Sequence, residues 1–416
     1  MRNNLHKRNR NKLLELIEDN SIAIIHSGYH VSRSADADFP FECNRNSFYL
    51  TGIKEDNVIL VLSKINNKTS ERLFIDENDP VMVKWVGAKA TVEEASELSG
   101  VNKEDISYHK DFENYVFSLL QSNRRSLGQV EKIYLDLDQK PNPLFNSFGL
   151  EYARHMQHRF PALIIKNIYN LVLSLRMIKE EEEINYIKES IETTKEAIYH
   201  AMRSAKTAQN EAVVDANFKF ILNCHGKKES FDGIVGSGKN ATILHYTDNN
   251  SPIEKDSLIL MDVGTATNLY ASDITRTFPA NGKFTKRQRE VYEAVLEVNK
   301  KCIEFLRAGL TWAEYNEYAN GLIKAACEKL GLAKDFRNYY YHSIGHSLGL
   351  DVHDPDLANL GIKAGMVVTV EPGIYIEDEH IGVRIEDDIL ITNDGCINLS
   401  QEIIKEVEDI EKLMSE

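Results

Sequence analysis

Two patterns of apolar residues divide the chain near residue 172. Before this point, short runs rich in Ile, Val, Leu and Phe alternate with stretches whose apolar residues recur at helical spacing. The runs predict strands and the periodic stretches predict helices. The predicted strands are 22–28, 57–64, 72–77 and 132–138, and the predicted helices are 91–100 and 111–121. Alternating elements of this kind predict an α/β domain.

The second pattern begins with a long amphipathic helix. Within 176–206, the residues Ile184, Ile187, Ile191 and Ile198 are spaced so that they share one helical face. Further helices are expected at 285–307 and 311–330, and strands at 256–264, 270–278, 366–376 and 383–392. We therefore predict two domains, 1–173 and 174–416.

Two segments of this second part look like ligand sites but are interpreted otherwise. The glutamate run 180–183 lies near the start of the long helix, where solvated negative charge is favourable. The segment GIVGSGKN (233–240) nearly matches a phosphate-binding loop, but it ends in Asn240, which lacks the hydroxyl that would hold Mg²⁺. We interpret it as a flexible turn that delivers His245 to a site.

Composition narrows the class of protein. The net charge of −15, from 49 basic and 64 acidic residues, argues against a nucleic-acid-binding surface. Five scattered cysteines without a C-x-x-C pair indicate a reducing compartment. No signal peptide or long apolar run is visible, so we expect a cytoplasmic protein without a membrane partner.

Four carboxylates lie inside or at the end of strongly apolar runs. They are Asp262, Asp273, Glu371 and Glu386. A buried carboxylate without a partner costs several kcal/mol, and four together would also repel one another. Each one alone is more simply interpreted as a strand-edge residue that faces water. Taken together, they favour a site in which two divalent cations neutralise four negative charges.

Histidines near these carboxylates strengthen the metal interpretation. His342, His346 and His353 lie in one glycine-containing segment, HSIGHSLGLDVHD. A neutral imidazole among oxygen ligands suits a transition ion such as Mn²⁺. Two Asp, two Glu and one His suggest two ions about 3.5–4 Å apart, which polarise a bridging water against a carbonyl. This chemistry is hydrolysis.

At these positions the sequence resembles bacterial aminopeptidase P, the Xaa-Pro aminopeptidases of the M24B metallopeptidases. The matching strings are ILHYTDN (243–249), LMDVGTATNLYASDITRTFPANGKFT (260–285), HSIGHSLGLDVHD (342–354), TVEPGIY (369–375) and GVRIEDD (382–388). The resemblance continues in RSADADFPFECNRNSFYLTG (33–52), so it covers nearly the whole chain. Ser347 departs from the pattern, because a bulkier residue often follows the metal histidine.

The resemblance implies a ligand set for two metal ions, expected to be Mn²⁺. Asp262 would bind one ion, His346 and Glu371 the other, and Asp273 and Glu386 both. Glu371 would also carry the proton from the bridging hydroxide, which attacks the scissile carbonyl, to the leaving nitrogen.

Further site residues are implied by the same resemblance. His245, His353 and His342 would line the substrate site. Arg384 would share a strand face with Glu386, where it could orient the ligand carboxylates or bind a substrate carboxylate. Tyr375 is a candidate wall of the proline pocket. Trp85 is a candidate contribution to the site of a neighbouring subunit.

The implied fold is an α/β N-terminal domain followed by an α+β pita-bread catalytic domain. The substrates would be peptides with proline second, and the chain would form a homodimer or homotetramer. An Xaa-Pro dipeptidase (prolidase) uses the same motifs and stays open as an alternative. A methionine aminopeptidase does not need the N-terminal domain, and an inactive peptide-binding relative would have lost metal ligands that are all present here.

Overall fold

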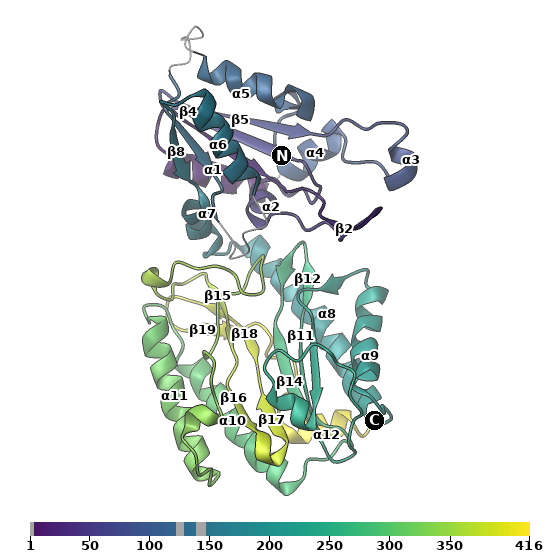
Figure 1. The fold of residues 1–416 in the computed structure, drawn as a ribbon. Coiled ribbons are helices and arrows are strands. Elements are labelled where there is room, and N and C mark those ends of the chain that lie inside the picture. Colours follow the sequence, from purple (N-terminus) through teal and green to yellow (C-terminus); the bar gives the residue numbers. More distant parts are fainter. Residues whose placement is uncertain (1–3, 122–128, 139–146) are drawn as a thin grey trace. The chain divides into compact units, whose positions relative to one another are not determined.

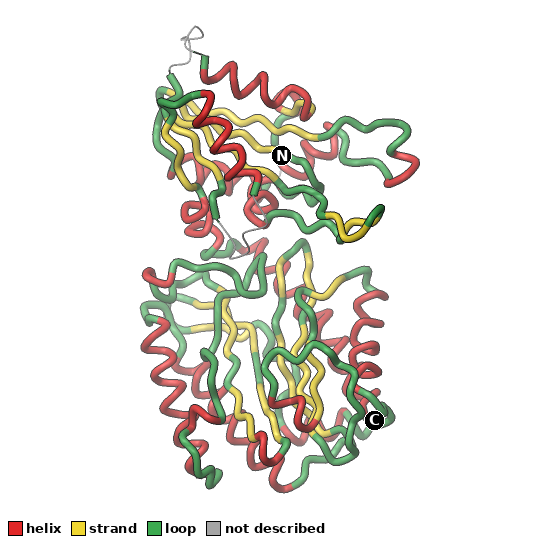
Figure 2. Tube along the Cα trace, viewed as in Figure 1, coloured by secondary structure: helices red, strands yellow, loops and turns green. Residues whose placement is uncertain are grey.

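The computed structural model describes residues 4–121, 129–138 and 147–416. The chain divides into two compact units, Met1–Arg176 and Met177–Glu416. Each unit has its own sheets and helices (Figures 1 and 2). None of the helices in the described part of the chain is apolar over a length that would cross a bilayer.

The first unit is built on one mixed sheet of six strands in the order β6-β5-β4-β1-β7-β8. These strands are β1 (Ser21–His26), β4 (Ile59–Ile65), β5 (Lys68–Ile75), β6 (Ile106–Tyr108), β7 (Lys132–Leu135) and β8 (Ile164–Asn167). The short strands β2 (Ser32–Ser34) and β3 (Ala37–Asp38) form a separate pair. The central strand β1 is fully buried and runs parallel to β7 and antiparallel to β4.

Seven α-helices lie in the described part of the first unit. They are α1 (Leu5–Leu16), α2 (Arg45–Thr51), α3 (Val83–Val86), α4 (Val92–Ser99), α5 (Phe112–Leu120), α6 (Phe148–Arg159) and α7 (Tyr169–Arg176). Side chains of α5 and α6 such as Phe112, Val116 and Met156 join Ile24 and Ile133 of the sheet in one apolar core. The expected α/β organisation is confirmed, with the predicted strands and helices displaced by a few residues at their ends.

The second unit has four small antiparallel sheets. Its strands are β9 (Lys228–Glu229), β10 (Ile234–Ser237), β11 (Leu258–Val263), β12 (Thr265–Thr267), β13 (Tyr270–Ala271), β14 (Ile274–Pro279), β15 (Val367–Val370), β16 (Gly373–Ile376), β17 (Ile381–Arg384), β18 (Asp387–Ile391) and β19 (Cys396–Asn398). They assemble as β10-β11-β14, β13-β12-β9, β15-β18-β19 and β16-β17.

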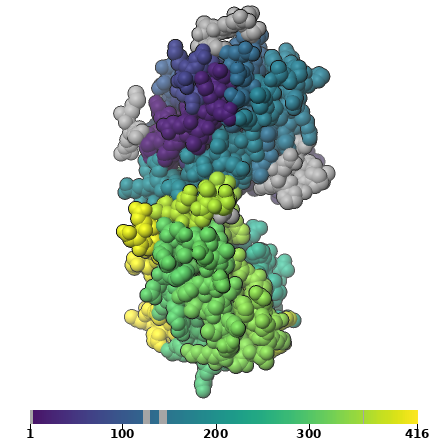
Figure 3. Space-filling model, turned by 90° about the vertical axis from the view of Figure 1, so that its left-hand side faces the viewer, coloured from purple at the N-terminus to yellow at the C-terminus, as the bar shows by residue number. Residues whose placement is uncertain are grey.

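Helices cover the outside of these sheets (Figure 1). They are α8 (Glu181–Ala205), α9 (Glu211–Cys224), α10 (Lys286–Phe305), α11 (Trp312–Lys329) and α12 (Val407–Leu413). α8 packs against β12 and β13, and α10 packs against β15, β16 and β17. α11 lies at the surface in Figure 3, where the green residues face the viewer, and it buries Tyr315, Ala319, Ile323 and Cys327 at i, i+4 spacing.

Two long hairpins of this unit are interrupted part-way along, so that the two parts of each hairpin belong to different sheets. In the first hairpin, β11 pairs with β14 and then β12 pairs with β13. In the second, β15 pairs with β18 and β16 pairs with β17. The breaks occur at Gly264, Ser272–Asp273, Glu371–Pro372 and Ile385–Glu386. At Gly264, an added Cβ would lie 1.9 Å from the carbonyl oxygen of Ser272, so only glycine fits this crossing.

Three expectations about local structure were wrong. The segments 270–278, 366–376 and 383–392 are not single strands, because each is interrupted at its candidate metal-binding carboxylate. Glu183 is not solvated: it is 1% exposed and accepts hydrogen bonds from the Tyr270 hydroxyl and the Glu180 N–H. The segment 233–240 is not simply a turn, because its middle forms β10 and its end begins the 3₁₀ helix 238–242.

Candidate active site

The strand breaks bring the four predicted carboxylates into one cavity. Asp262 is the penultimate residue of β11, Asp273 directly precedes β14, and Glu371 and Glu386 occupy the two breaks of the second hairpin. All four line a cavity of about 550 Å³, together with His245, His342, His346, His353 and Arg384. Asp262 and Glu386, which are more than 120 positions apart in the sequence, therefore lie in the same cavity, as expected from the sequence.

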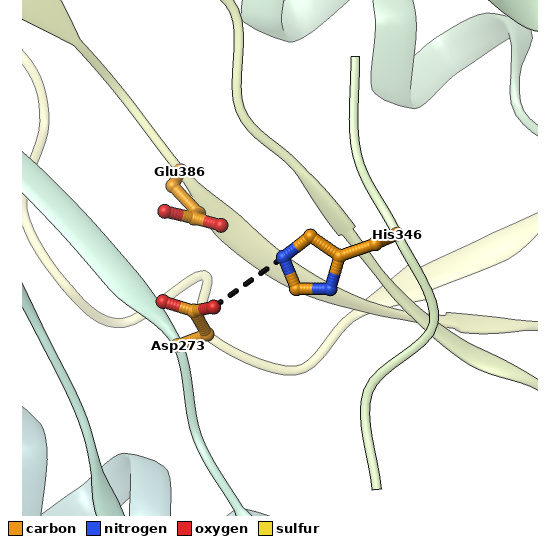
Figure 4. Close-up of side chains that lie close together, drawn as sticks. All are labelled: Asp273, His346 and Glu386. Atoms are coloured by element: carbon orange, nitrogen blue, oxygen red, sulfur yellow. Dashed lines mark ion pairs between the residues drawn. The ribbon is translucent and has the colours of Figure 1, made fainter. Parts of the chain in front are cut away.

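Asp273, His346 and Glu386 form the tightest part of this group. Their ligand atoms all lie within 4.8 Å of one another, and the His346 ring points toward both carboxylates in Figure 4. His346 Nε2 is 3.5 Å from Asp273 Oδ2 and 3.7 Å from Glu371 Oε1. An imidazole nitrogen and several carboxylate oxygens at these distances can share a divalent cation.

Neighbouring groups orient these side chains. The Thr275 hydroxyl donates to Glu386 Oε2 at 2.7 Å, and the Asp273 N–H donates to Asp388 Oδ2 at 3.2 Å. His346 Nδ1 lies 3.0 Å from the Ser347 carbonyl oxygen. Because a carbonyl can only accept, Nδ1 carries the proton, and the lone pair of Nε2 faces the carboxylates.

Burial shifts the pKa values of the ionisable side chains in this group. Burial raises the pKa of Asp273 and of Glu386 well above their usual values, and the neighbouring carboxylates raise them further. Burial also raises the pKa of Glu371 to about 8, although Arg384 opposes the shift. Conversely, burial lowers the pKa of His346 to about 4. A cation bound between these groups would bring the three raised carboxyl pKa values back down, and it would keep His346 neutral.

Asp262 has a carboxylate oxygen that is free to bind a cation. Its Oδ1 is buried and has no hydrogen-bond partner among the described residues. Its Oδ2 accepts from Arg384 Nη2 at 2.7 Å. A buried carboxylate oxygen without a donor normally binds a metal ion or water. The donor set and this free oxygen therefore fit the divalent ions expected from the sequence.

Arg384 connects the carboxylates to His342 through Tyr375. Arg384 Nη1 donates to the Tyr375 hydroxyl at 3.0 Å, and this hydroxyl lies 2.9 Å from His342 Nε2. His342 Nδ1 lies 2.8 Å from the Ser343 carbonyl oxygen, so Nε2 is the acceptor. Burial lowers the pKa of His342 to about 3, which keeps this ring neutral.

Tyr375 lies elsewhere than expected, whereas the expected role of Trp85 stays a prediction. Tyr375 is 2% exposed and does not line the cavity; it supports His342 and Arg384 from behind. Trp85 lies on α3 in the first unit and is 81% exposed. Arg384 and Glu386 do not share a continuous strand, but both bond to the Thr275 hydroxyl, which brings them to the same cavity.

Several residues that line the cavity were not predicted from the sequence. They include Trp312, Asn316, Ser343, Asp354 and Asp356. Asp354 and Asp356 lie one and three residues after His353 in DVHDPD, so the unusual density of Asp and His there was a usable signal. Trp312 and Asn316 come from the start of α11, and no local pattern distinguished them from other helix residues.

His245 and His353 face the cavity from separate loops. The rings of His353 and His346 are 4.0 Å apart between centroids. The exposed His245 precedes Tyr246, whose hydroxyl donates to Glu211 Oε2 at 2.8 Å. Glu211 is fully buried and also accepts from the Ser237 N–H and hydroxyl, Asn240 Nδ2 and the Ser251 N–H. One carboxylate thus holds both ends of the loop that carries His245.

Glu211→Gln should therefore lower activity through His245. The glutamine NH₂ group would face the N–H and O–H groups that donate to Glu211, and this would displace the loop. A displaced catalytic loop costs about tenfold to a hundredfold in kcat/KM. The measurement is a double-mutant comparison with His245→Ala, with Glu196→Gln on the surface of α8 as the control. If Glu211 acts by positioning His245, its substitution has little further effect in the His245→Ala background. An undiminished effect there would contradict the positioning role.

Comparison with known proteins agrees with this geometry. Residues 185–393 match the model of metallopeptidase family M24, and residues 6–127 match the aminopeptidase P N-terminal domain. The chain belongs to the M24 metallopeptidases. Within M24 it belongs to the aminopeptidase P family, because it is 33% identical to the Xaa-Pro aminopeptidase of Escherichia coli over 98% of this chain and 97% of that protein.

Other members of the aminopeptidase P family are also similar to this chain over nearly its whole length. The chain is 31% identical to the Xaa-Pro aminopeptidase of Haemophilus influenzae over 98% of the chain and 96% of that protein. Its fold matches a putative aminopeptidase P from Bacillus anthracis with a TM-score of 0.94 and 41% identity, over 99% of this chain and 98% of that one. Zinc-substituted E. coli aminopeptidase P in complex with product matches with a TM-score of 0.89 and 30% identity, over the same shares. The expected pita-bread fold is confirmed, and the chain is a metallo-aminopeptidase that uses divalent ions.

Proposed function

We propose that this enzyme removes the first residue from peptides that carry proline second. The observation that carries the proposal is the meeting of Asp262, Asp273, His346, Glu371 and Glu386 in one cavity. The full-length similarity to Xaa-Pro aminopeptidases supplies the substrate class.

These five side chains would hold two divalent ions. Asp262 would bind one ion, His346 and Glu371 the other, and Asp273 and Glu386 would bind both. Such ions, when bound, act as Lewis acids on the scissile carbonyl and lower the pKa of water. Four carboxylates and one imidazole suit a hard transition ion, so we propose Mn²⁺ as the native metal.

The chain's own groups would move the proton and hold the substrate. Glu371 lines the cavity, with its Oε1 3.7 Å from His346 Nε2, so its carboxylate would be placed to accept a proton and deliver it to the leaving nitrogen of proline. His245, His353 and His342 line the same cavity and would hold the substrate carbonyls. Arg384 would keep Asp262 in place, because their side chains form a 2.7 Å ion pair. Tyr375 would keep His342 in its acceptor form.

Assembly and location are further parts of the proposal. Val81, Met82, Trp85 and Val86 are 51–81% exposed around α3, which is an apolar surface suited to contact with a second copy. We propose a homodimer or homotetramer in which Trp85 approaches a neighbouring active site. The five cysteines are all free thiols, which is consistent with a cytoplasmic location.

A peptide series tests the proposed substrate class. Purified enzyme with Mn²⁺ would be given the tripeptides Xaa-Pro-Xaa and Xaa-Ala-Xaa and the dipeptide Xaa-Pro. We expect release of the first residue, fastest from the proline tripeptide. Preference for the dipeptide would instead indicate a prolidase, and equal cleavage of the alanine peptide would contradict proline specificity.

Metal binding should release protons near neutral pH. Because the pKa of Glu371 is raised to about 8 from 4.5 in the metal-free protein, Glu371 holds a proton at pH 7 that must leave when a cation binds. The stability of the metal-free protein should correspondingly fall as the pH rises from 4.5 through 8. Calorimetry in two buffers of different ionisation enthalpy measures the release. Glu371→Gln should release fewer protons; an unchanged number would contradict this assignment.

A further inference from the structure

Six carboxylates line the cavity, and five of them have a charge partner or a proposed metal role. The six are Asp262, Asp273, Asp354, Asp356, Glu371 and Glu386. Asp354 is neutralised by Lys179, whose Nζ is 3.2 Å away in a pair with side-chain exposures of 1% and 2%. The proposed metal set accounts for four others. Asp356 is the remaining one, and the metal set does not include it.

Asp356 is bound only by neutral donors. Its Oδ2 accepts from the indole Nε1–H of Trp312 at 3.0 Å and from the Ser347 hydroxyl at 2.9 Å. Within the described part of the chain it forms no ion pair, and its Oδ1 has no hydrogen-bond partner. One oxygen is therefore anchored, while the other remains able to accept from a ligand in the cavity.

Both anchors are held by the fold. Trp312 is the first residue of α11, and its carbonyl accepts from Asn316 Nδ2 at 2.8 Å. Ser347 forms a β-bridge with Val368. The carboxylate and the indole thus form a defined wall, which we call the Asp356 wall and which consists of Trp312, Ser347 and Asp356.

We propose that the Asp356 wall selects substrates whose first residue is lysine or arginine. This inference rests on the proposed function. An unpaired carboxylate beside an aromatic ring attracts an ammonium or guanidinium group by ion pairing and by cation–π contact. Ser347 directly follows the candidate ligand His346, so the wall lies beside the place where the scissile carbonyl would sit. The residue that contributes this carbonyl is the first residue, and its side chain is the one that can reach the wall.

Asp356→Asn tests the wall without removing its anchors. The asparagine Oδ1 can still accept from Trp312 and Ser347, but the amide nitrogen replaces the free oxygen with a donor. In the wild type, kcat/KM should be about fivefold to tenfold higher for Arg-Pro-Ala than for citrulline-Pro-Ala, and lowest for Glu-Pro-Ala. In Asp356→Asn the three values should converge, because the citrulline peptide is unaffected and the glutamate peptide improves. Asp394→Asn, an exposed loop substitution, is the matched control.

The other outcomes separate the alternatives. A uniform loss for all peptides in Asp356→Asn would mean that Asp356 holds the α-ammonium group or the loop, and it would overturn the proposal. A basic preference only at the third residue, measured with Ala-Pro-Arg and Ala-Pro-citrulline, would also overturn it. Failure of the metal-loaded wild type to cleave any of these peptides would contradict the proposed function itself, which is a distinguishable result.

Discussion

Glu386→Gln should lower kcat/KM by about a thousandfold, equivalent to about 4 kcal/mol of transition-state stabilisation. Glu386 is 2% exposed, and its ligand oxygen lies within 4.8 Å of those of Asp273 and His346. The Glu386 carboxylate would bind both ions, whereas a glutamine supplies only one weak oxygen ligand. The number of bound metal ions should therefore fall below two per chain. Steady-state kinetics and elemental analysis of the same preparation measure both effects.

The control for this substitution is Glu402→Gln, which makes the same change at an exposed position. Far-ultraviolet circular dichroism of both variants should match the wild type, since the Thr275 hydroxyl can still donate to the glutamine oxygen. If Glu386→Gln kept two ions and full activity, the ligand assignment would be wrong.

Asp387→Asn should lower the free energy of unfolding by about 3–5 kcal/mol, because it breaks a buried ion pair from one side. Asp387 Oδ1 is 2.8 Å from Arg276 Nη2, and both side chains are 0% exposed. Asp387 also pairs with Lys405. The substitution leaves Arg276 with only carbonyl acceptors, among them Glu386 O at 2.6 Å. Urea denaturation at pH 7 measures the loss, and Asp394→Asn should show almost none.

The pH dependence of this difference has a defined sign. Burial alone would raise the pKa of Asp387, but Arg276 and Lys405 outweigh burial and lower it from 3.8 to about 2. A lowered pKa contributes stability above pH 3.8 that is lost as the pH falls through 2. The difference between wild type and Asp387→Asn should therefore shrink between pH 4 and pH 2. A difference that does not change with pH would contradict an ion-pair origin.

The sequence predicted the members of the site better than the backbone that holds them. Asp262, Asp273, Glu371 and Glu386 were recognisable because a carboxylate in an apolar run has a high desolvation cost wherever the run folds. The strand breaks at Glu371 and Glu386 were not recognisable. At these breaks the Glu386 N–H bonds to the Thr275 carbonyl, at 3.1 Å, and the Glu371 N–H bonds to the Ile344 carbonyl, at 2.8 Å. These are long-range pairings that no local pattern of hydrophobicity encodes.

Side chains whose role depends on tertiary partners were also missed. Glu183 appeared solvated in a run of four glutamates, but Tyr270, 87 positions away, gives it a buried donor at 2.8 Å. Trp312 and Asp356 are 44 positions apart, and only the fold places the indole N–H against the carboxylate. Tyr375 was correctly associated with the site region, but its burial behind His342 could not be predicted from its position in TVEPGIY.

Metal titration of the metal-free enzyme tests most directly whether four carboxylates and His346 hold two ions that make the cavity a peptidase. Chelated protein would receive Mn²⁺ in small steps while first-residue release from a proline tripeptide is followed. We expect no activity in chelator and a rise in activity that saturates at two equivalents of Mn²⁺ per chain. Full activity in the presence of chelator, or full activity without any bound metal, would contradict this assignment of the metal ligands.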